Sequence, residues 1–348
     1  MSVMDTLKNV PKQLLSKAEE ATKDWSAEQK RLTGAVVATA VAASGVTFLA
    51  MRLAGRSNSG AGVRPDSHSK SSDIYESEAS ARQYMEFHYT PSKESYTQRL
   101  RAVSEASDFP TRLAHKFHTY LKPGKRGLRG LDVGCATGAS VLEMSKVFDG
   151  GVVGIDFSEV FIHLAKEVAA MPKSGKKVLY TAPVQGEITE PRELELPRGV
   201  HPERCAFYAG DAMDMFEEDH KMEKTVSNRY SDVTYWQAKK GEKFDGVLCL
   251  NLIDRVPDPQ RLIHSFGRLV EKEGVLILAD PYSWWEDATP KAKWLGGTRD
   301  GARSEEVIVA ALKKEFELLS ESDEGFLIRD HIRHYQLGFS HCTVWRKK

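Results

Sequence analysis

The sequence predicts an α/β fold in which a mostly parallel sheet of seven strands carries helices on both faces. Residues 131–138, LDVGCATG, are typical of a buried strand that ends in a glycine turn, and residues 152–156, VVGID, of a second strand that ends in an acid. Two further apolar runs, 207–212 and 244–252, also end in polar residues. Strands in this pattern build a doubly wound sheet with a ligand site at their carboxyl ends.

The other expected elements follow in chain order. A helix of about four turns joins the first two strands. The remaining predicted helices cover residues 77–87, 111–121, 260–270 and 304–314, the last capped by Ser304. The remaining predicted strands cover residues 275–279, 316–320 and 339–345. Two long connections, 171–204 and 217–243, predict an irregular insertion and a partly helical excursion.

The turn after the first strand has the chemistry of a nucleotide-binding loop. Gly134 and Gly138 allow the backbone to approach a ligand closely, and Asp156 suits two ribose hydroxyls. A dinucleotide site would have G-x-G-x-x-G, whereas this chain has D-x-G-x-x-x-G. That loop resembles the cofactor loop of class I S-adenosylmethionine (SAM) methyltransferases, which have a Rossmann-like fold. A tight strand-to-helix turn without a ligand is the alternative interpretation.

The resemblance implies that SAM is the cofactor. It places Asp211 near the adenine amino group and Asn251 at the edge where transfer occurs. The predicted cofactor-binding residues are Asp132, Gly134, Cys135, Gly138, Asp156, Phe157, Asp211, Ala212 and Asn251.

Composition excludes several other classes of function. The chain has 49 Lys and Arg residues and 49 Asp and Glu residues, so no basic excess drives binding to nucleic acid. The four cysteines are scattered without a C-x-x-C pair, which indicates buried thiols in a reducing compartment. His331 and His334 have no third ligand at suitable spacing, so no metal is expected.

The N-terminal part predicts a membrane anchor. Residues 1–31 form a charged, amphipathic helical segment, and the uncharged run 32–51 has the length of one membrane-spanning helix. Residues 52–72 predict a flexible linker before the catalytic domain, 73–348. We expect a single-pass protein whose catalytic domain faces the cytoplasm. A helical hairpin or a processed targeting segment is the alternative, and would leave a soluble cytoplasmic or organellar enzyme.

An aromatic block after the fifth strand suggests the methyl acceptor. Within residues 280–297, Trp284 and Trp285 can form a wall against a planar ring, and their π faces favour a cation. Packing of a long loop is the alternative for these tryptophans. Near the C-terminus, Arg329 or Arg333 can bind a substrate carboxylate with two hydrogen bonds. For Arg333, a solvated charged face is the alternative.

Several segments together carry a narrower resemblance. They are residues 74–77, 87–89, 134–136, 251–259, 281–284, 294–297 and 326–331. The chain from 73 to 348 resembles the 4-mercaptohistidine N1-methyltransferase family, which is similar to the C-terminal domain of bifunctional ovothiol synthase. The resemblance implies that an imidazole nitrogen of 5-thiohistidine is methylated, the last step of ovothiol A formation. The iron-dependent sulfoxide synthase part is missing, so a separate protein would act upstream.

The resemblance also implies roles for individual residues. Asn251 and Tyr282 would contact the imidazole, and Asp280 or His331 would accept the proton. The expected substrate-binding residues are Tyr75, His88, Trp284, Trp285 and Arg329. Two alternatives stay open. One is a methyltransferase for protein histidine or another small metabolite, and the other is a membrane-tethered SAM-binding scaffold without turnover.

Overall fold

A computed structural model describes residues 78–89, 106–219, 230–299 and 301–348. The predicted N-terminal segments 1–31, 32–51 and 52–72 lie outside the described residues, as does Tyr75. Within the described ranges, none of the helices is both long and apolar enough to cross a bilayer.

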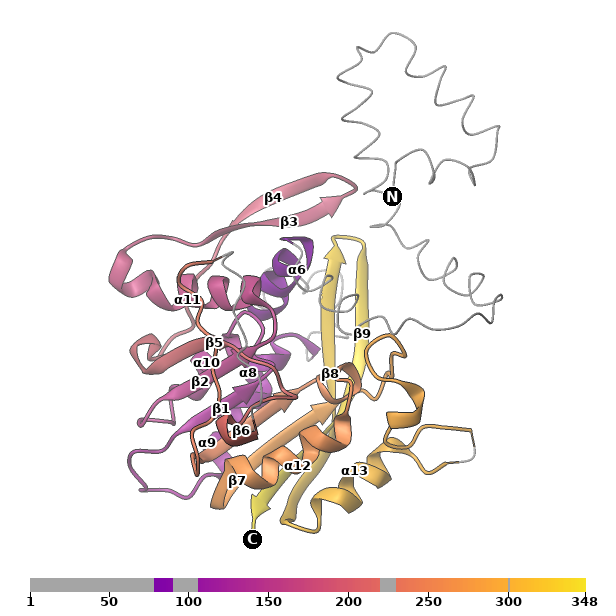
Figure 1. Ribbon diagram of the computed structural model, residues 1–348. Helices are drawn as coiled ribbons and strands as arrows, with labels where there is room; N and C mark the ends of the chain where they lie inside the picture. Colours follow the sequence, from indigo (N-terminus) through magenta and orange to yellow (C-terminus); the bar gives the residue numbers. More distant parts are fainter. Residues whose placement is uncertain (1–77, 90–105, 220–229, 300) are drawn as a thin grey trace, which may run out of the picture. The chain divides into compact units, whose positions relative to one another are not determined.

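Seven strands form one sheet in the order β5-β2-β1-β6-β7-β9-β8 (Figure 1). The strands are β1 (Gly130–Val133), β2 (Val152–Asp156), β5 (Cys205–Ala209), β6 (Phe244–Leu250), β7 (Val270–Asp280), β8 (Phe316–His331) and β9 (His334–Lys347). The first five pair in parallel, and β9 runs antiparallel to both β7 and β8. The predicted sheet is therefore confirmed. Because the order reverses at β1, a crevice forms between the carboxyl ends of β2, β1 and β6.

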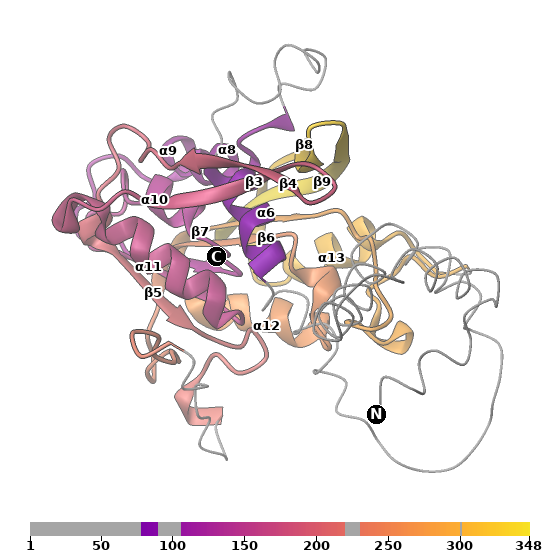
Figure 2. The same cartoon turned by 90° about the horizontal axis from the view of Figure 1, so that it is seen from above.

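Helices cover both faces of this sheet (Figure 2). They are α6 (Glu78–Tyr89), α8 (Phe109–His115), α9 (Phe117–Tyr120), α10 (Ala139–Met144), α11 (Glu159–Ser174), α12 (Pro259–Leu269) and α13 (Ser304–Leu312). Figure 2 shows α8, α9, α10 and α11 on one side and α12 and α13 on the other. The alternation of apolar residues along the strands explains this, since successive side chains point to opposite faces.

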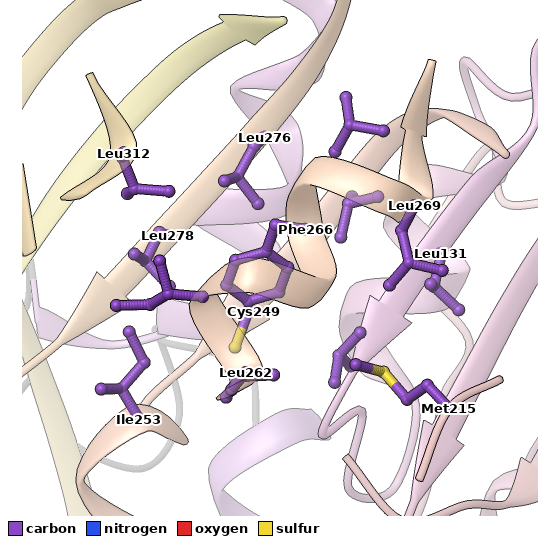
Figure 3. Packing of buried hydrophobic residues seen from close by; sticks show 14 of the residues in the cluster. Leu131, Met215, Cys249, Ile253, Leu262, Phe266, Leu269, Leu276, Leu278 and Leu312 are labelled. Atoms are coloured by element: carbon purple, nitrogen blue, oxygen red, sulfur yellow. The ribbon is translucent and has the colours of Figure 1, made fainter. Parts of the chain in front are cut away.

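Two apolar clusters correspond to the two faces. On one face, Leu262 and Phe266 of α12 pack on Leu131, Leu276 and Leu278 of the sheet (Figure 3). On the other face, side chains of α8, α9, α10 and α11 pack on Leu248 and on other strand residues. Burying each large apolar side chain contributes roughly 1.5–3 kcal/mol. Both clusters hold the strands rigid, so the carboxyl ends form a fixed platform for a ligand.

The structure corrects several predicted elements. Helix α10 has six residues, in place of the four turns expected. The predicted irregular insertion instead contains a two-stranded hairpin of β3 (Leu179–Gln185) and β4 (Ile188–Glu193), turned at Gly186 with φ 57°. Among the described residues of the segment 217–243, the helical part is a short 3-10 turn, Glu217–Asp219. Farther along this segment, Ala238 forms an isolated β-bridge with Phe216.

The C-terminal elements also differ from the prediction. Residues 326–336, which include Arg329 and Arg333, belong to the long β8–β9 hairpin. Strands β8 and β9 are longer than predicted because they pair along almost their whole length. Arg303, and not Ser304, is the N-cap of α13, because the Ser304 hydroxyl accepts a hydrogen bond from Trp284 Nε1 at 2.9 Å.

Candidate cofactor and acceptor site

A cavity opens in the crevice at the carboxyl ends of β1, β2, β5 and β6, and α6 and α8 cover part of it. Its lining combines residues of the strand-end loops with an aromatic wall. The strand-end residues include Asp132, Gly134, Ala136, Asp156, Phe157, Asp211, Ala212, Asn251 and Arg255. The helical residues include Tyr84, Phe87, His88, Phe109 and Phe161. The sheet thus brings together the ends of four strands that are far apart in sequence.

The glycine loop adopts a conformation that few side chains tolerate. Gly134 has φ 84° and Gly138 has φ 89°, both in the left-handed region. A Cβ atom on Gly138 would lie 2.6 Å from Cε1 of Phe207, and one on Gly134 would lie 3.1 Å from Cδ2 of Leu252. Gly138 is also the N-cap of α10. The loop therefore holds its backbone close to the cavity and leads directly into a helix.

Asp156 fixes this loop and faces the same cavity. One carboxylate oxygen accepts a hydrogen bond from Ala136 N at 2.9 Å, and the other accepts one from Ser158 N at 2.9 Å. Each oxygen of a carboxylate has a second lone-pair site. Asp156 therefore fits two neighbouring hydroxyls of a ribose. Phe157 lies beside it in the lining, with 52% of its surface exposed.

Asp211, just after the neighbouring strand β5, also lines the cavity. Its Oδ1 accepts a hydrogen bond from Met213 N at 2.8 Å, and its own backbone N–H donates to the Tyr235 hydroxyl at 3.2 Å. Ala212 continues the lining. A carboxylate held in this way at the end of β5 suits an amino group such as that of adenine. The polar and apolar groups of the cavity fit an adenosine-containing cofactor.

Asp132 is the buried acid of the site. It is 1% exposed, and its carboxylate accepts a hydrogen bond from the Ser140 hydroxyl. Burial raises the pKa of Asp132 from 3.8 to about 7, with a smaller contribution from the nearby Asp156 charge. Asp132 therefore binds a proton more tightly in the folded chain than in the unfolded chain.

Replacing Asp132 by Asn should change the pH dependence of stability. Between about pH 4 and pH 7 the folded state holds the extra proton, so its stability falls as pH rises, in total by on the order of 4 kcal/mol. Asn keeps the acceptor for Ser140 but does not ionise, so the fall should be smaller in Asp132→Asn. Urea unfolding at pH 4.5 and 7.5, with no cofactor added, measures the difference. Equal pH dependence of the two proteins would contradict this assignment.

Asn251 follows β6 and reaches the cavity in a left-handed conformation, with φ 51°. Its side-chain Oδ1 accepts a hydrogen bond from the Ser340 hydroxyl at 2.7 Å. Its backbone N–H donates to Ala279 O at 2.8 Å. Because both β7 and β9 hold it, Asn251 presents a fixed edge to whatever occupies the crevice.

Helix α6 provides the aromatic wall. The ring of Tyr84 lies 4.7 Å from that of Phe161, and Phe87 stacks on Phe109 at 6.3 Å. His88 is buried, and its Nδ1 accepts a hydrogen bond from Ala139 N at 3.3 Å, at the start of α10. Burial lowers the pKa of His88 to about 3, so the imidazole is neutral and carries its hydrogen on Nε2. The sequence predicts a helix here but does not single out Tyr84, Phe109 and Phe161, which have no motif of their own.

Residues 105–318 match the family model described as a methyltransferase domain. The chain belongs to this methyltransferase family. Together with the sheet order and the cavity, this makes it a class I SAM-dependent methyltransferase, and SAM is its cofactor.

Curated relatives of this methyltransferase include ubiquinone biosynthesis O-methyltransferases of Salmonella arizonae and Salmonella enteritidis. Each is 28% identical over 123 residues, which is 32% of this chain and 48% of the relative. The chain therefore spans about half the length of the curated relatives that it matches.

Solved structures to which the chain is similar include magnesium protoporphyrin IX methyltransferase of Synechocystis with bound SAM. It is 13% identical, with a TM-score of 0.46, over 83% of this chain and 100% of that chain. An arsenic (III) SAM methyltransferase of Chlamydomonas reinhardtii is 17% identical, with a TM-score of 0.37, over 69% and 73% of the two chains.

The two predicted proton acceptors, Asp280 and His331, lie outside the cavity lining. Asp280 is fully buried and accepts hydrogen bonds from the backbone N–H groups of Ile253 and Tyr282, at 2.8 and 2.9 Å. It caps the end of β7 and does not line the cavity. Burial and the neighbouring Asp254 raise its pKa well above the usual value. His331 lies at the turn of the β8–β9 hairpin, where its Nδ1 accepts from Arg333 N at 3.2 Å.

Tyr282 and the two tryptophans also lie outside the cavity lining. The Tyr282 hydroxyl pairs with His341 Nδ1 at 2.8 Å, in a separate surface hollow with Glu321. Trp284 stacks on Trp294 at 6.0 Å. Trp285 is half-buried, and its backbone carbonyl accepts from Ala288 and Thr289. The packing alternative therefore describes these aromatic rings, while Ala288 of the same loop reaches the cavity.

Arg329 needs the largest correction. Its guanidinium is 2% exposed and pairs with Glu86 and Glu190, each at 3.4 Å, and donates to Pro183 O at 3.1 Å. These partners belong to α6 and to the β3–β4 hairpin, so Arg329 joins three elements and is not directed at a substrate. Cys135 is likewise buried and outside the lining, and burial raises its pKa well above the usual value. Its side chain belongs to the apolar cluster beneath α8, α9, α10 and α11.

Proposed function

We propose that this methyltransferase transfers the methyl group of SAM to an imidazole nitrogen of 5-thiohistidine. The observation that carries the proposal is the aromatic wall of α6 and α8 beside Asn251, in a cavity that also contains one arginine, Arg255. Tyr84, Phe87 and Phe109 offer flat faces to a heteroaromatic ring. The family resemblance of residues 73–348 supports the same acceptor. The proposed reaction requires a sulfoxide synthase activity upstream that supplies the thiohistidine.

The rate of the proposed methyl transfer depends mainly on how the imidazole is oriented toward the methyl group. When bound, SAM supplies an electrophilic methyl group on a sulfonium sulfur. The residues of the cavity exclude water and hold the neutral imidazole in line with that carbon, which is worth many powers of ten in rate. An imidazole nitrogen with a free lone pair needs no base for the attack. His88, neutral and with a hydrogen on Nε2, can donate a hydrogen bond to the acceptor but does not accept its proton through Nδ1.

A panel of acceptors tests the proposed function. The full-length chain is incubated with SAM carrying a labelled methyl group and with 5-thiohistidine, histidine, a histidine-containing peptide or a catechol. The proposal predicts transfer to an imidazole nitrogen of thiohistidine at a rate well above that for histidine. Preference for the peptide would support a protein-histidine methyltransferase, and preference for the catechol an O-methyltransferase. Binding of SAM without transfer to any acceptor would favour the scaffold alternative and overturn the proposal.

Replacing Arg255 by Met should weaken binding of the acceptor. The Nη1 group of Arg255 donates to Asp254 O and Ser283 O, at 3.0 and 2.9 Å, and lies 3.0 Å from the buried Asp254 carboxylate, so the other guanidinium N–H groups are the donors for a substrate carboxylate. Loss of such a charged hydrogen bond costs roughly 1.5–3 kcal/mol, so KM for thiohistidine should rise roughly tenfold or more, with the SAM Kd unchanged. Arg261→Met, an exposed residue of α12, is the matched control. An unchanged KM in Arg255→Met would remove Arg255 from the acceptor site.

We also propose that residues 32–51 anchor the chain in a membrane, with the catalytic domain on the cytoplasmic side. The support is the length and the uncharged composition of this run. Alkaline extraction of membranes should leave the full chain in the pellet and release a chain that lacks residues 1–72. Release of the full chain would contradict the anchor.

A further inference from the structure

A second group of polar side chains gathers away from the cavity, where α8, α9 and α10 meet. His115 ends α8, His118 lies in α9, and Glu143 lies in α10. One ligand atom from each residue lies within 4.8 Å of those of the other two. His115 Nδ1 is 2.9 Å from Glu143 Oε1, and the two imidazole rings stack with their centroids 4.4 Å apart. None of these residues lines the cofactor cavity.

Two imidazoles and one carboxylate form a donor set that zinc prefers. Zinc sites with three protein ligands of these types keep a fourth position for water. With bonds of about 2.0–2.2 Å, tetrahedral ligand atoms lie roughly 3.3–3.5 Å apart. The ligand atoms of His115, His118 and Glu143 all lie within 4.8 Å of one another, which is within about 1.5 Å of that arrangement. Small rotations of the two imidazoles would complete it.

The burial of the three residues suits such a site. The Glu143 side chain is 3% exposed, whereas that of His115 is 64% exposed, and His118 is also exposed. The carboxylate is therefore fixed from the protein side, and the imidazoles can close over an ion from the solvent side. Glu143 Oε2 is 2.6 Å from Lys146 Nζ, which leaves Oε1 as the oxygen for the ion. Lys146 would compete with a bound cation by repulsion.

We propose that His115, His118 and Glu143 form a binding site for one divalent transition metal ion of the zinc type. The ion would join α8 to α10. Helix α8 carries Phe109 of the cavity wall, and α10 begins at the glycine loop. The ion would therefore stabilise the two helices that support the cavity, without touching the reacting groups.

Metal titration tests this site directly. The full-length chain is stripped with a chelator and titrated with zinc by calorimetry, and with cobalt(II) by absorption. The proposal predicts one saturable site with the intense cobalt bands of low coordination number, and a higher unfolding temperature with metal. His118→Ala should weaken binding by roughly tenfold or more. Because His118 is exposed, this change leaves no buried group without a partner.

Two further variants complete the test. Lys146→Met should tighten metal binding, because it removes the competing positive charge. His264→Ala, an exposed histidine of α12 outside the cluster, is the matched control and should bind like the original chain. Absence of saturable binding, or equal affinity of the original chain and His118→Ala, would overturn the proposal.

Discussion

Replacing Arg329 by Met should lower the free energy of unfolding by about 3 kcal/mol and should leave no selective defect in binding of the acceptor. Arg329 and Glu86 are a buried ion pair, with side-chain exposures of 2% and 0%. Removing one partner of such a pair leaves an uncompensated buried charge, which typically costs about 3–5 kcal/mol. The lower value is expected here because Arg192 Nε still lies 2.9 Å from Glu86 Oε1. Urea unfolding measures the loss.

Two controls separate this structural role from the substrate role that the sequence suggested. Arg333→Met, on an exposed side chain of the same hairpin, should change stability by less than about 0.5 kcal/mol. Combining Arg329→Met with Glu86→Gln should recover part of the lost stability, because the buried carboxylate is then neutral. A stable Arg329→Met protein with a strongly raised acceptor KM would show that Arg329 binds substrate after all.

Replacing Asp156 by Ala should weaken SAM binding on the order of 100-fold. Its two oxygens face the cavity and also hold Ala136 N and Ser158 N at 2.9 Å, so the change removes ligand contacts and loosens the glycine loop. Hydrogen bonds to charged groups contribute about 1.5–3 kcal/mol each. Calorimetric titration with SAM measures the loss.

The matched control for Asp156 is another acid of the same sheet. Asp245→Ala, at the amino end of β6, removes an acid that pairs with Lys125 far from the cavity lining, and should leave the SAM Kd unchanged. Asp156→Asn should show an intermediate loss, since an amide keeps one acceptor oxygen. If Asp156→Ala bound SAM as tightly as the original chain, the ribose role of Asp156 would have to be abandoned.

The cofactor half of the site was predictable because its signals are local. Gly134 adopts a left-handed conformation, and Asp156 is an acid at the end of a strand. Both features can be recognised from the few residues around them. The mostly parallel sheet with helices on both faces follows from the apolar pattern and the general rules of doubly wound sheets. The predicted strand 152–156 has the same bounds as β2.

The acceptor half was not predictable, because it depends on contacts between distant segments. From the sequence alone, Arg329 suggests a group that binds a substrate carboxylate. In the fold, Glu86, from the other end of the domain, is buried beside Arg329 and pairs with it. Tyr282 is turned away by its own left-handed backbone, with φ 52°, and by the strand cap that Asp280 forms. Trp284 donates a hydrogen bond to the Ser304 hydroxyl, and Trp294 donates one to Thr289 O. The residues around each tryptophan in the sequence do not reveal these partners.

Hydrogen exchange of the full-length chain with and without SAM tests the central claim most directly. If the crevice between β2, β1 and β6 is the SAM site, amides should become protected in the glycine loop 134–138, at 156–158 and 210–213, and in α6. Protection confined to other surfaces, for instance around Arg261 and Lys293 beside α12, with no change at these strand ends, would contradict it.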